Sequence, residues 1–323
     1  MSRKAFYTVI AFLLAGIFVT FGIFLFQRDM KAGKVDAALI VKSRQSGFEF
    51  WEQLEKGAEE GAKEFGVDLK VDGALSEDDT EGQIAAVQRA IAEEPDVLIL
   101  AAVDQDALLP YAKEAKEKGI KLILVDSGLR EPVEDCFVKT DNYEAANYVG
   151  DVMGQEMGAG KVAIVSHARQ TTTAQQRIAG FERALLNYPE IKIIGAYDTG
   201  DSTQRSYETT AKLLQENPDI TGIFATNQIS AEGVSQAIEE AGRSGIYFYA
   251  FDHSIAQNEA LEKGTVNGFA AQNAFNMGYT AVKAAAEASR GTLRENVIDT
   301  GFTFATRENM REEEIQKLIY PFV

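Results

Sequence analysis

The chain has 323 residues, of which 46% are hydrophobic, 10% aromatic and 25% charged, a composition typical of a folded protein and not of a disordered one. Its length predicts two domains. Acidic residues outnumber basic ones by 49 to 32, so the net charge is −17 and nucleic acid is a poor candidate partner. One cysteine and two histidines exclude an intrachain disulfide and a cysteine-cluster metal site, and we predict neither a metal nor a cofactor.

The first 34 residues form a segment of their own. The run from Ala5 to Phe26 has no charged residue and is long enough to span a bilayer as a helix. A signal-peptide core is usually shorter and ends at small residues, whereas this run ends in Leu25-Phe26-Gln27-Arg28. We predict an uncleaved membrane anchor, with a cleaved signal as the alternative. Basic residues flank the run on both sides, so charge does not decide its orientation.

The body after Lys34 alternates short apolar runs with longer amphipathic stretches. This pattern predicts an α/β protein with parallel sheets and right-handed crossovers. The predicted strands are 37–41, 69–71, 97–100, 121–125, 161–165, 191–196, 222–225, 246–251 and 266–270. The predicted helices are 48–65, 80–92, 107–118, 142–157, 174–186, 204–215, 231–241 and 274–288.

A weak internal repeat divides the body into two similar halves. In each half a glycine is followed seven residues later by an aspartate at the carboxyl end of a predicted strand, Gly119 by Asp126 and Gly245 by Asp252. Open α/β sheets bind ligands beyond the carboxyl ends of their strands. Two such lobes facing each other would therefore place the two aspartates on opposite walls of one cleft.

Several motifs resemble those of periplasmic sugar-binding proteins of the ribose-binding type. They are Phe50-Trp51, Gly57-Ala58, 124–127, 140–142, 176–181, 223–227, Phe251-Asp252 and Ala271-Gln272, within a resemblance that covers about 35–303. The resemblance implies the type I periplasmic binding protein fold, with two Rossmann-like lobes joined by a three-crossing hinge, in addition to the predicted N-terminal transmembrane helix. The implied lobes are 35–140 with 273–299, and 141–272 with 300–323.

The same resemblance implies a sugar site between the lobes. Aromatic faces would stack on the sugar ring, and planar polar side chains would each make two hydrogen bonds to hydroxyl groups. The implied site residues are Phe50, Trp51, Asp126, Arg177, Asn227, Phe251, Asp252 and Gln272. Ser43 and Asp201 are weaker candidates. Ser127 stands where ribose binders often carry arginine, so the resemblance does not identify the sugar.

The implied function is that of a solute-binding protein, not an enzyme, which captures a monosaccharide or a related polyol for an ABC-type importer. A permanent anchor also fits a sugar-sensing receptor that signals to a membrane partner such as a sensor histidine kinase. Both functions imply a body on the extracytoplasmic side of the cell envelope. A sugar-transforming enzyme is a third hypothesis, but the sequence places no acid and base together for it. We interpret His167 as a residue of a loop or the cleft edge and not as a catalytic base.

Overall fold

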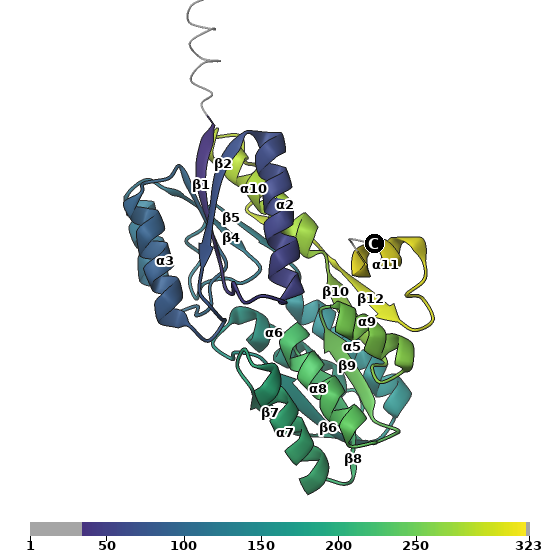
Figure 1. Cartoon of the computed structure of the whole chain (residues 1–323). Helices are drawn as coiled ribbons and strands as arrows, with labels where there is room; N and C mark the ends of the chain where they lie inside the picture. The colour runs from purple at the N-terminus through teal and green to yellow at the C-terminus, as the bar shows by residue number, and fades with distance from the viewer. Residues whose placement is uncertain (1–33, 321–323) are drawn as a thin grey trace, which may run out of the picture. The chain divides into compact units, whose positions relative to one another are not determined.

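The computed structural model describes residues 34–320 and contains two six-stranded sheets (Figure 1). The first sheet has the strand order β11-β5-β4-β3-β1-β2, and the second has the order β12-β10-β9-β8-β6-β7. The strands of the first sheet are β1 (Val35–Val41), β2 (Val67–Gly73), β3 (Val97–Leu100), β4 (Lys121–Val125), β5 (Cys136–Lys139) and β11 (Val297–Asp299). Those of the second are β6 (Gly160–Ser166), β7 (Ile191–Asp198), β8 (Ile220–Ala225), β9 (Tyr247–Phe251), β10 (Gly268–Gln272) and β12 (Phe302–Thr306).

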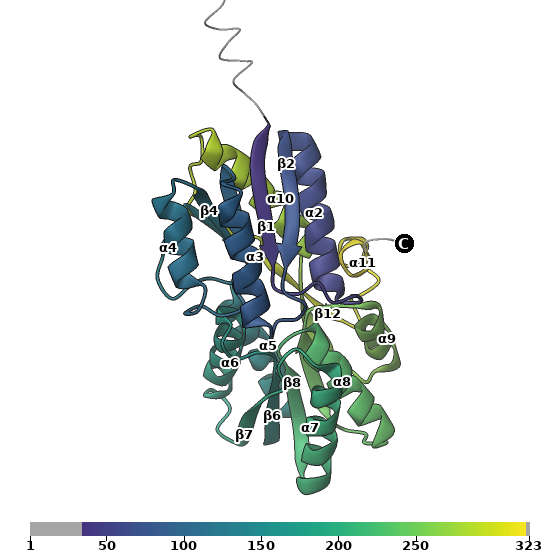
Figure 2. The same cartoon turned by 60° about the vertical axis from the view of Figure 1, so that its left-hand side comes forward.

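Helices cover both faces of each sheet (Figures 1 and 2). The first sheet lies between α2 (Glu49–Phe65) with α10 (Ala274–Ser289) on one face and α3 (Thr80–Ala92) with α4 (Leu109–Glu117) on the other. The second lies between a pair formed by α5 (Asn142–Met157) and α6 (Thr172–Leu185) and a pair formed by α7 (Thr203–Glu216) and α8 (Gln228–Glu240). The remaining helices are α9 (Ile255–Lys263) and α11 (Glu313–Ile319). We call each sheet with its helices a lobe.

The sequence determines several of these boundaries through local chemistry. All four residues of β3, Val-Leu-Ile-Leu, are buried, as a parallel strand covered on both faces requires. Helix α2 ends at Gly66, whose φ of 67° is left-handed and favours glycine. The side chains of Asp79 and Asp141 accept hydrogen bonds from backbone N–H groups in the first turns of α3 and α5, so each aspartate caps its helix.

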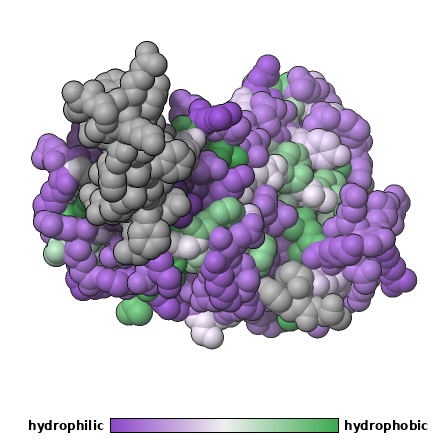
Figure 3. Space-filling model, turned by 90° about the horizontal axis from the view of Figure 1, so that it is seen from above, coloured by the Kyte–Doolittle hydropathy of each residue, from purple (hydrophilic) through white to green (hydrophobic). Residues whose placement is uncertain are grey.

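The apolar side chains form a buried cluster against the first sheet and one on each face of the second. On the face of the molecule that Figure 3 shows, hydrophilic residues predominate and apolar ones are scattered.

Within the described residues, the chain passes between the two sheets at three places. The crossings follow β5 at Thr140, β10 at Asn273 and β11 at Thr300. Two of them are hydrogen-bonded to each other, because the Thr300 N–H donates to the Lys139 carbonyl over 2.8 Å and Thr140 Oγ1 donates to the Gly301 carbonyl over 3.2 Å. Few backbone segments therefore connect the two lobes.

All predicted strands and helices are present, with boundaries that shift by at most three residues. The prediction missed β5, β11, β12, α9 and α11, which are short or lie next to loops. The strand pairs are parallel as predicted, except that the missed strand β12 pairs antiparallel with β10. The predicted anchor, Ala5 to Phe26, lies outside the described residues. None of the helices between residues 34 and 320 is both long enough and apolar enough to cross a membrane.

Two glycines allow α2 and α10 to approach closely. A Cβ atom on Gly57 would lie 1.9 Å from the carbonyl oxygen of Phe275, and one on Gly278 would lie 2.0 Å from that of Leu54. Both obstacles are backbone atoms, so a side chain at either position would force the helices apart. The predicted Gly57-Ala58 motif thus belongs to the packing of the first lobe.

We expect Gly278→Ala to lower the free energy of unfolding by about 1–3 kcal/mol, because the added methyl group has no space. Urea denaturation measures this change as a lower midpoint. Lys283→Ala, on the exposed side of the same helix, is the control and should stay within about 0.5 kcal/mol of wild type. An unchanged midpoint for Gly278→Ala would contradict the close helix contact.

Candidate functional site

A small cavity lies where the carboxyl ends of strands from both lobes meet. Its free volume is about 10 Å³, roughly what one water molecule needs and far below the 300 Å³ or more of a typical ligand pocket. It is lined by Lys42, Phe48, Phe50, Trp51, Glu77, Asp126, His167, Thr173, Arg177, Asn227, Asp252 and Gln272. The site is therefore closed by its own side chains in this conformation.

Asp126 and Asp252 occupy equivalent positions in the two lobes, as the repeat predicts. They follow β4 and β9, which hold the same place in their sheets. Both have a left-handed backbone, with φ of 62° and 66°. Each donates its backbone N–H over 2.9 Å to the next strand of its sheet, Asp126 to Val138 and Asp252 to Ala270. Asparagine and aspartate tolerate this conformation better than most residues.

On the first wall, a buried lysine holds Asp126. Lys42 Nζ lies 2.8 Å from Asp126 Oδ2 and 3.7 Å from Glu77 Oε2, with all three side chains 3% exposed. The ammonium is also 5.4 Å from the centre of the Trp51 ring. Burial opposes the charge, but the Asp126 and Glu77 carboxylates outweigh it and raise the pKa of Lys42 above its usual value. Lys42 therefore stays a cation inside the cavity.

The rest of the first wall is aromatic. Phe50 and Trp51, in the first turn of α2, pack edge to face with ring centres 4.9 Å apart. Trp51 Nε1 donates a 3.0 Å hydrogen bond to Glu77 Oε1, so the indole orientation is fixed by a polar partner. Both aromatic residues line the cavity, as the resemblance implies for them.

On the second wall, a buried arginine is held from several sides. Arg177 donates to Asn142 Oδ1 and to the Thr226 carbonyl, both over 2.7 Å, and lies 3.5 Å from Asp252 Oδ2. Its guanidinium stacks 4.1 Å from the centre of the Phe251 ring. Phe251 is not among the lining residues and instead belongs to the apolar cluster behind the wall. Its ring therefore orients Arg177 in this conformation.

Asp252 is hydrogen-bonded to one of the two predicted amides, Gln272. Its carboxylate accepts from Gln272 Nε2 over 2.7 Å and from the Gln228 N–H over 3.3 Å. Burial raises the pKa of Asp252, although the Arg177 guanidinium opposes the shift. Asn227 caps α8 through its side-chain oxygen. That leaves Asn227 Nδ2 and Gln272 Oε1 buried and without a hydrogen-bond partner among the described residues.

The cavity is bordered by hydrogen bonds between the lobes. Asp201, from the loop after β7, accepts the Glu77 N–H over 2.9 Å. Asp78, which directly follows Glu77, pairs with Arg205 of the other lobe. Glu49 accepts the Ile255 N–H over 3.0 Å, and the Gly128 N–H donates to Thr172 over 2.9 Å. Asp201, one of the two weaker candidates, therefore lies at the border and does not line the cavity. Ser43, the other, is buried and does not line the cavity either; its hydroxyl accepts from the Gln45 N–H.

Both histidines are buried and neutral. Burial, with the Arg177 and Lys42 charges, lowers the pKa of His167 well below its usual value, and its two ring nitrogens contact Thr226 and Thr173. Burial lowers the pKa of His253 to about 4, and its Nε2 contacts Gln53 of the other lobe. In residues 34–320 no group of three or more potential metal ligands is placed to hold an ion.

Four lining residues were not predicted: Lys42, Phe48, Glu77 and Thr173. His167, interpreted from the sequence as a residue of a loop or the cleft edge and not as a site residue, also lines the cavity. Lys42 directly follows β1, and Glu77 lies in the loop between β2 and α3. Their position after strands of the same sheet was the available signal. It was weak, because neither residue belongs to the repeated pattern that identifies Asp126 and Asp252.

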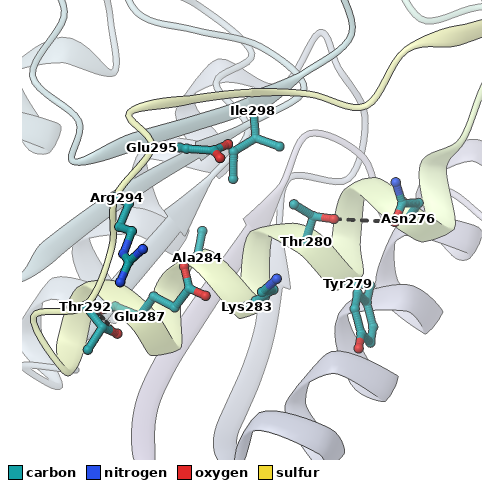
Figure 4. A pocket seen from close by; sticks show the side chains of 10 residues that line it. All are labelled: Asn276, Tyr279, Thr280, Lys283, Ala284, Glu287, Thr292, Arg294, Glu295 and Ile298. Carbon is teal, nitrogen blue, oxygen red and sulfur yellow. Dashed lines mark hydrogen bonds between the residues drawn. The ribbon is translucent and has the colours of Figure 1, made fainter.

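A larger hollow of about 630 Å³ lies elsewhere, along α10 (Figure 4). Its lining comes from α10 and the segment 292–298 only, and includes the exposed side chains of Asn276, Lys283 and Arg294. The walls lack the buried, convergent polar groups that hold a small ligand. The small cavity between the lobes is therefore the better candidate site.

Comparisons with known proteins identify the family. The periplasmic binding protein domain family matches residues 37–293. The D-ribose/D-allose-binding protein of Pseudomonas aeruginosa is 30% identical over 83% of this chain and 88% of its own, and the D-allose-binding periplasmic protein of Escherichia coli is 26% identical over 75% and 81%. These relatives are binding proteins, which confirms the prediction that the chain is not an enzyme.

Solved structures match the two-lobed fold. A carbohydrate transporter solute-binding protein from Agrobacterium radiobacter, in complex with D-arabinose, has a TM-score of 0.86 and 28% identity, covering 89% of this chain and 99% of its own. A solute-binding protein of an ABC transporter from Agrobacterium vitis, with bound D-fucose, has a TM-score of 0.85 and 28% identity, covering 88% and 100%. With a family match over most of its length and two lobes that close on a buried polar cavity, this chain belongs to the periplasmic binding proteins.

Proposed function

We propose that this protein captures a small sugar, a monosaccharide or related polyol, between its lobes for an ABC-type importer. The observation that carries the proposal is the set of buried polar atoms without a hydrogen-bond partner in residues that line the cavity: Glu77 Oε2, Asn227 Nδ2, Gln272 Oε1 and Asp126 Oδ2, the last of which has only its ion pair with Lys42. A buried polar atom without a partner costs free energy, so these atoms call for a ligand with hydroxyl groups. Phe50 and Trp51 supply apolar faces for the ring.

The proposed contacts are those of the predicted site residues. Asp126 and Asp252 accept from hydroxyl groups, and Arg177, Asn227 and Gln272 hydrogen-bond around the ring. Phe251 contributes by holding Arg177 in place, in agreement with the stacking between them. Sugars named for the relatives and matched structures, D-ribose, D-allose, D-arabinose and D-fucose, form the first panel of candidate ligands.

We expect at least one of these sugars, or a polyol such as xylitol, to bind the full-length protein in detergent, measured by calorimetry. Asp252→Asn should weaken that binding by about 10- to 100-fold, because a hydrogen bond to a charged group contributes about 1.5–3 kcal/mol. Asp126→Asn should weaken binding similarly. It should also lower the free energy of unfolding by about 3–5 kcal/mol, since it leaves Lys42 buried without its closest partner.

Two controls separate binding from stability. Asp96→Asn, outside the cavity, should preserve both properties. The double variant Lys42→Met/Asp126→Asn removes both members of the buried pair and should recover much of the stability but not the affinity. Wild-type affinity in both single aspartate variants would disprove the site, and no binding by any panel member would disprove sugar capture.

We further propose that the lobes rotate about the three crossings to admit the ligand, because the closed cavity has no room for a sugar. Spin labels at Leu75→Cys and Gln204→Cys, one on each lobe and both exposed, should report this motion. We expect a broad distance distribution without ligand and a single short distance with it. A label pair within the first lobe, at Leu75 and Lys113, should not respond. An unchanged distribution for the first pair at saturation would exclude rotation.

We also propose that residues 1–34 remain attached as a membrane anchor, with the body on the extracytoplasmic side. The uncharged run from Ala5 to Phe26 supports this proposal. Mass spectrometry of the membrane fraction should find the full-length chain, and protease added to intact cells should remove the body. A mature protein beginning near Lys31 would contradict the anchor.

A permanent anchor equally supports a second function, in which the protein reports sugar occupancy to a sensor histidine kinase. Co-purification from cross-linked membranes distinguishes the two, because an importer partner supports transport and a kinase partner supports sensing.

A further inference from the structure

Glu77 is the carboxylate of the cavity that the protein itself leaves incompletely bound. It lies in the loop between β2 and α3 and is 3% exposed. Its Oε1 accepts from Trp51 Nε1 over 3.0 Å, and its backbone N–H donates to Asp201 of the other lobe over 2.9 Å. Its Oε2 is fully buried and accepts no hydrogen bond from any described residue.

The nearby cations are already engaged with other groups. Lys42 Nζ is 3.7 Å from Glu77 Oε2, but only 2.8 Å from Asp126. Arg177 is held by Asn142, the Thr226 carbonyl and Asp252. Three lining carboxylates, Glu77, Asp126 and Asp252, thus face two cations, Lys42 and Arg177, while a fourth carboxylate, that of Asp201, accepts the Glu77 N–H.

An excess carboxylate in such a cavity has to be neutralised by a proton or stabilised by a donor. Burial raises the pKa of Glu77 to about 7, an effect that Lys42 opposes and that Asp201 and Asp126 reinforce. The groups that face Glu77 are Lys42 at the end of β1, Trp51 on α2, Asp126 after β4 and Asp201 after β7.

We infer that Glu77 is a specificity-determining residue, which takes a hydrogen-bond donor from the ligand, a hydroxyl or an ammonium group, and excludes ligands that carry a carboxylate or phosphate. The inference rests on the proposed function of sugar capture and adds a rule for which sugars enter. An anionic ligand would find no free cation among the lining residues and would add to the excess negative charge.

Two sets of matched sugars test this rule. They are D-glucose, D-glucosamine and D-glucuronate, and D-galactose, D-galactosamine and D-galacturonate, titrated into the full-length protein by calorimetry. In each set that binds, the neutral or amino sugar should bind at least about tenfold more tightly than the acid. A preference for the amino sugar identifies ammonium as the donor, and a preference for the neutral sugar identifies hydroxyl. Glu77→Gln should lower the affinity for the preferred sugar by about tenfold. It should also reduce the ratio by which that sugar binds more tightly than the acid.

The pH dependence provides a second measurement, which needs no variant. A donor favours the ionised form of Glu77, so wild-type affinity should increase as the pH rises from 6 to 8. A third measurement needs no ligand. The folded protein binds the Glu77 proton more tightly than the unfolded chain, so wild type loses stability relative to Glu77→Gln as the pH rises from about 4.5 to about 7. The melting temperature of Glu77→Gln minus that of wild type should therefore grow from pH 5 to pH 8.

Glu81→Gln, an exposed change of the same type in the first turn of α3, is the control and should behave like wild type in each measurement. Wild-type affinity and discrimination in Glu77→Gln would overturn the inference while leaving sugar capture intact. So would equal binding of the acid and the neutral sugar. If no sugar binds, the proposed function fails. The difference in melting temperature between Glu77→Gln and wild type then tests Glu77 by itself: a difference that does not change with pH would overturn the inference that this carboxylate lacks a partner in the folded protein.

Discussion

The structure depends on how five charges are kept away from water. Lys42, Glu77, Asp126, Arg177 and Asp252 are each at most 4% exposed, and all line one cavity. Isolated charges in such a place would be prohibitively costly, so the fold has to bring partners to them. It does this with opposite charges from different elements, Lys42 with Asp126 in one lobe and Arg177 with Asp252 in the other. The pairing makes each wall nearly complete before any ligand arrives.

Backbone strain shows the same dependence. Asp126 and Asp252 both adopt left-handed conformations, which generally cost free energy in residues other than glycine. Each conformation ends a buried strand and turns the carboxylate toward the cavity, and each is held by a backbone hydrogen bond to the neighbouring strand. The repetition of this arrangement in both lobes links the strained turns to the site and not to the general stability of the sheets.

The sequence made the alternating elements and the two aspartates predictable, because hydrophobic periodicity and a duplicated Gly-to-Asp spacing are local signals. Lys42 and Glu77 were not predictable in this way. A lysine after a strand and a glutamate in the acidic run 77–79 look like surface residues, and only the packing of β1 and β2 in one sheet brings them to the cavity. Short strands such as β5 and β11 carry too few residues for a periodic signal. Phe251 was predicted as a site residue next to Asp252, but its ring does not line the cavity, because it points to the face of the second sheet where an apolar cluster packs.

The interleaving of the chain has a consequence for the order in which it can fold. Helix α10 follows the last crossing out of the second sheet, yet it packs on α2 and completes a face of the first. During synthesis, Leu54, Ala58 and the other apolar residues of α2 must wait until more than 200 further residues have been made before their partner emerges. The first half of the chain cannot bury this face alone, so an unfinished polypeptide lacks a complete first lobe. Such a delay keeps the nascent chain from completing its first lobe until synthesis is nearly finished.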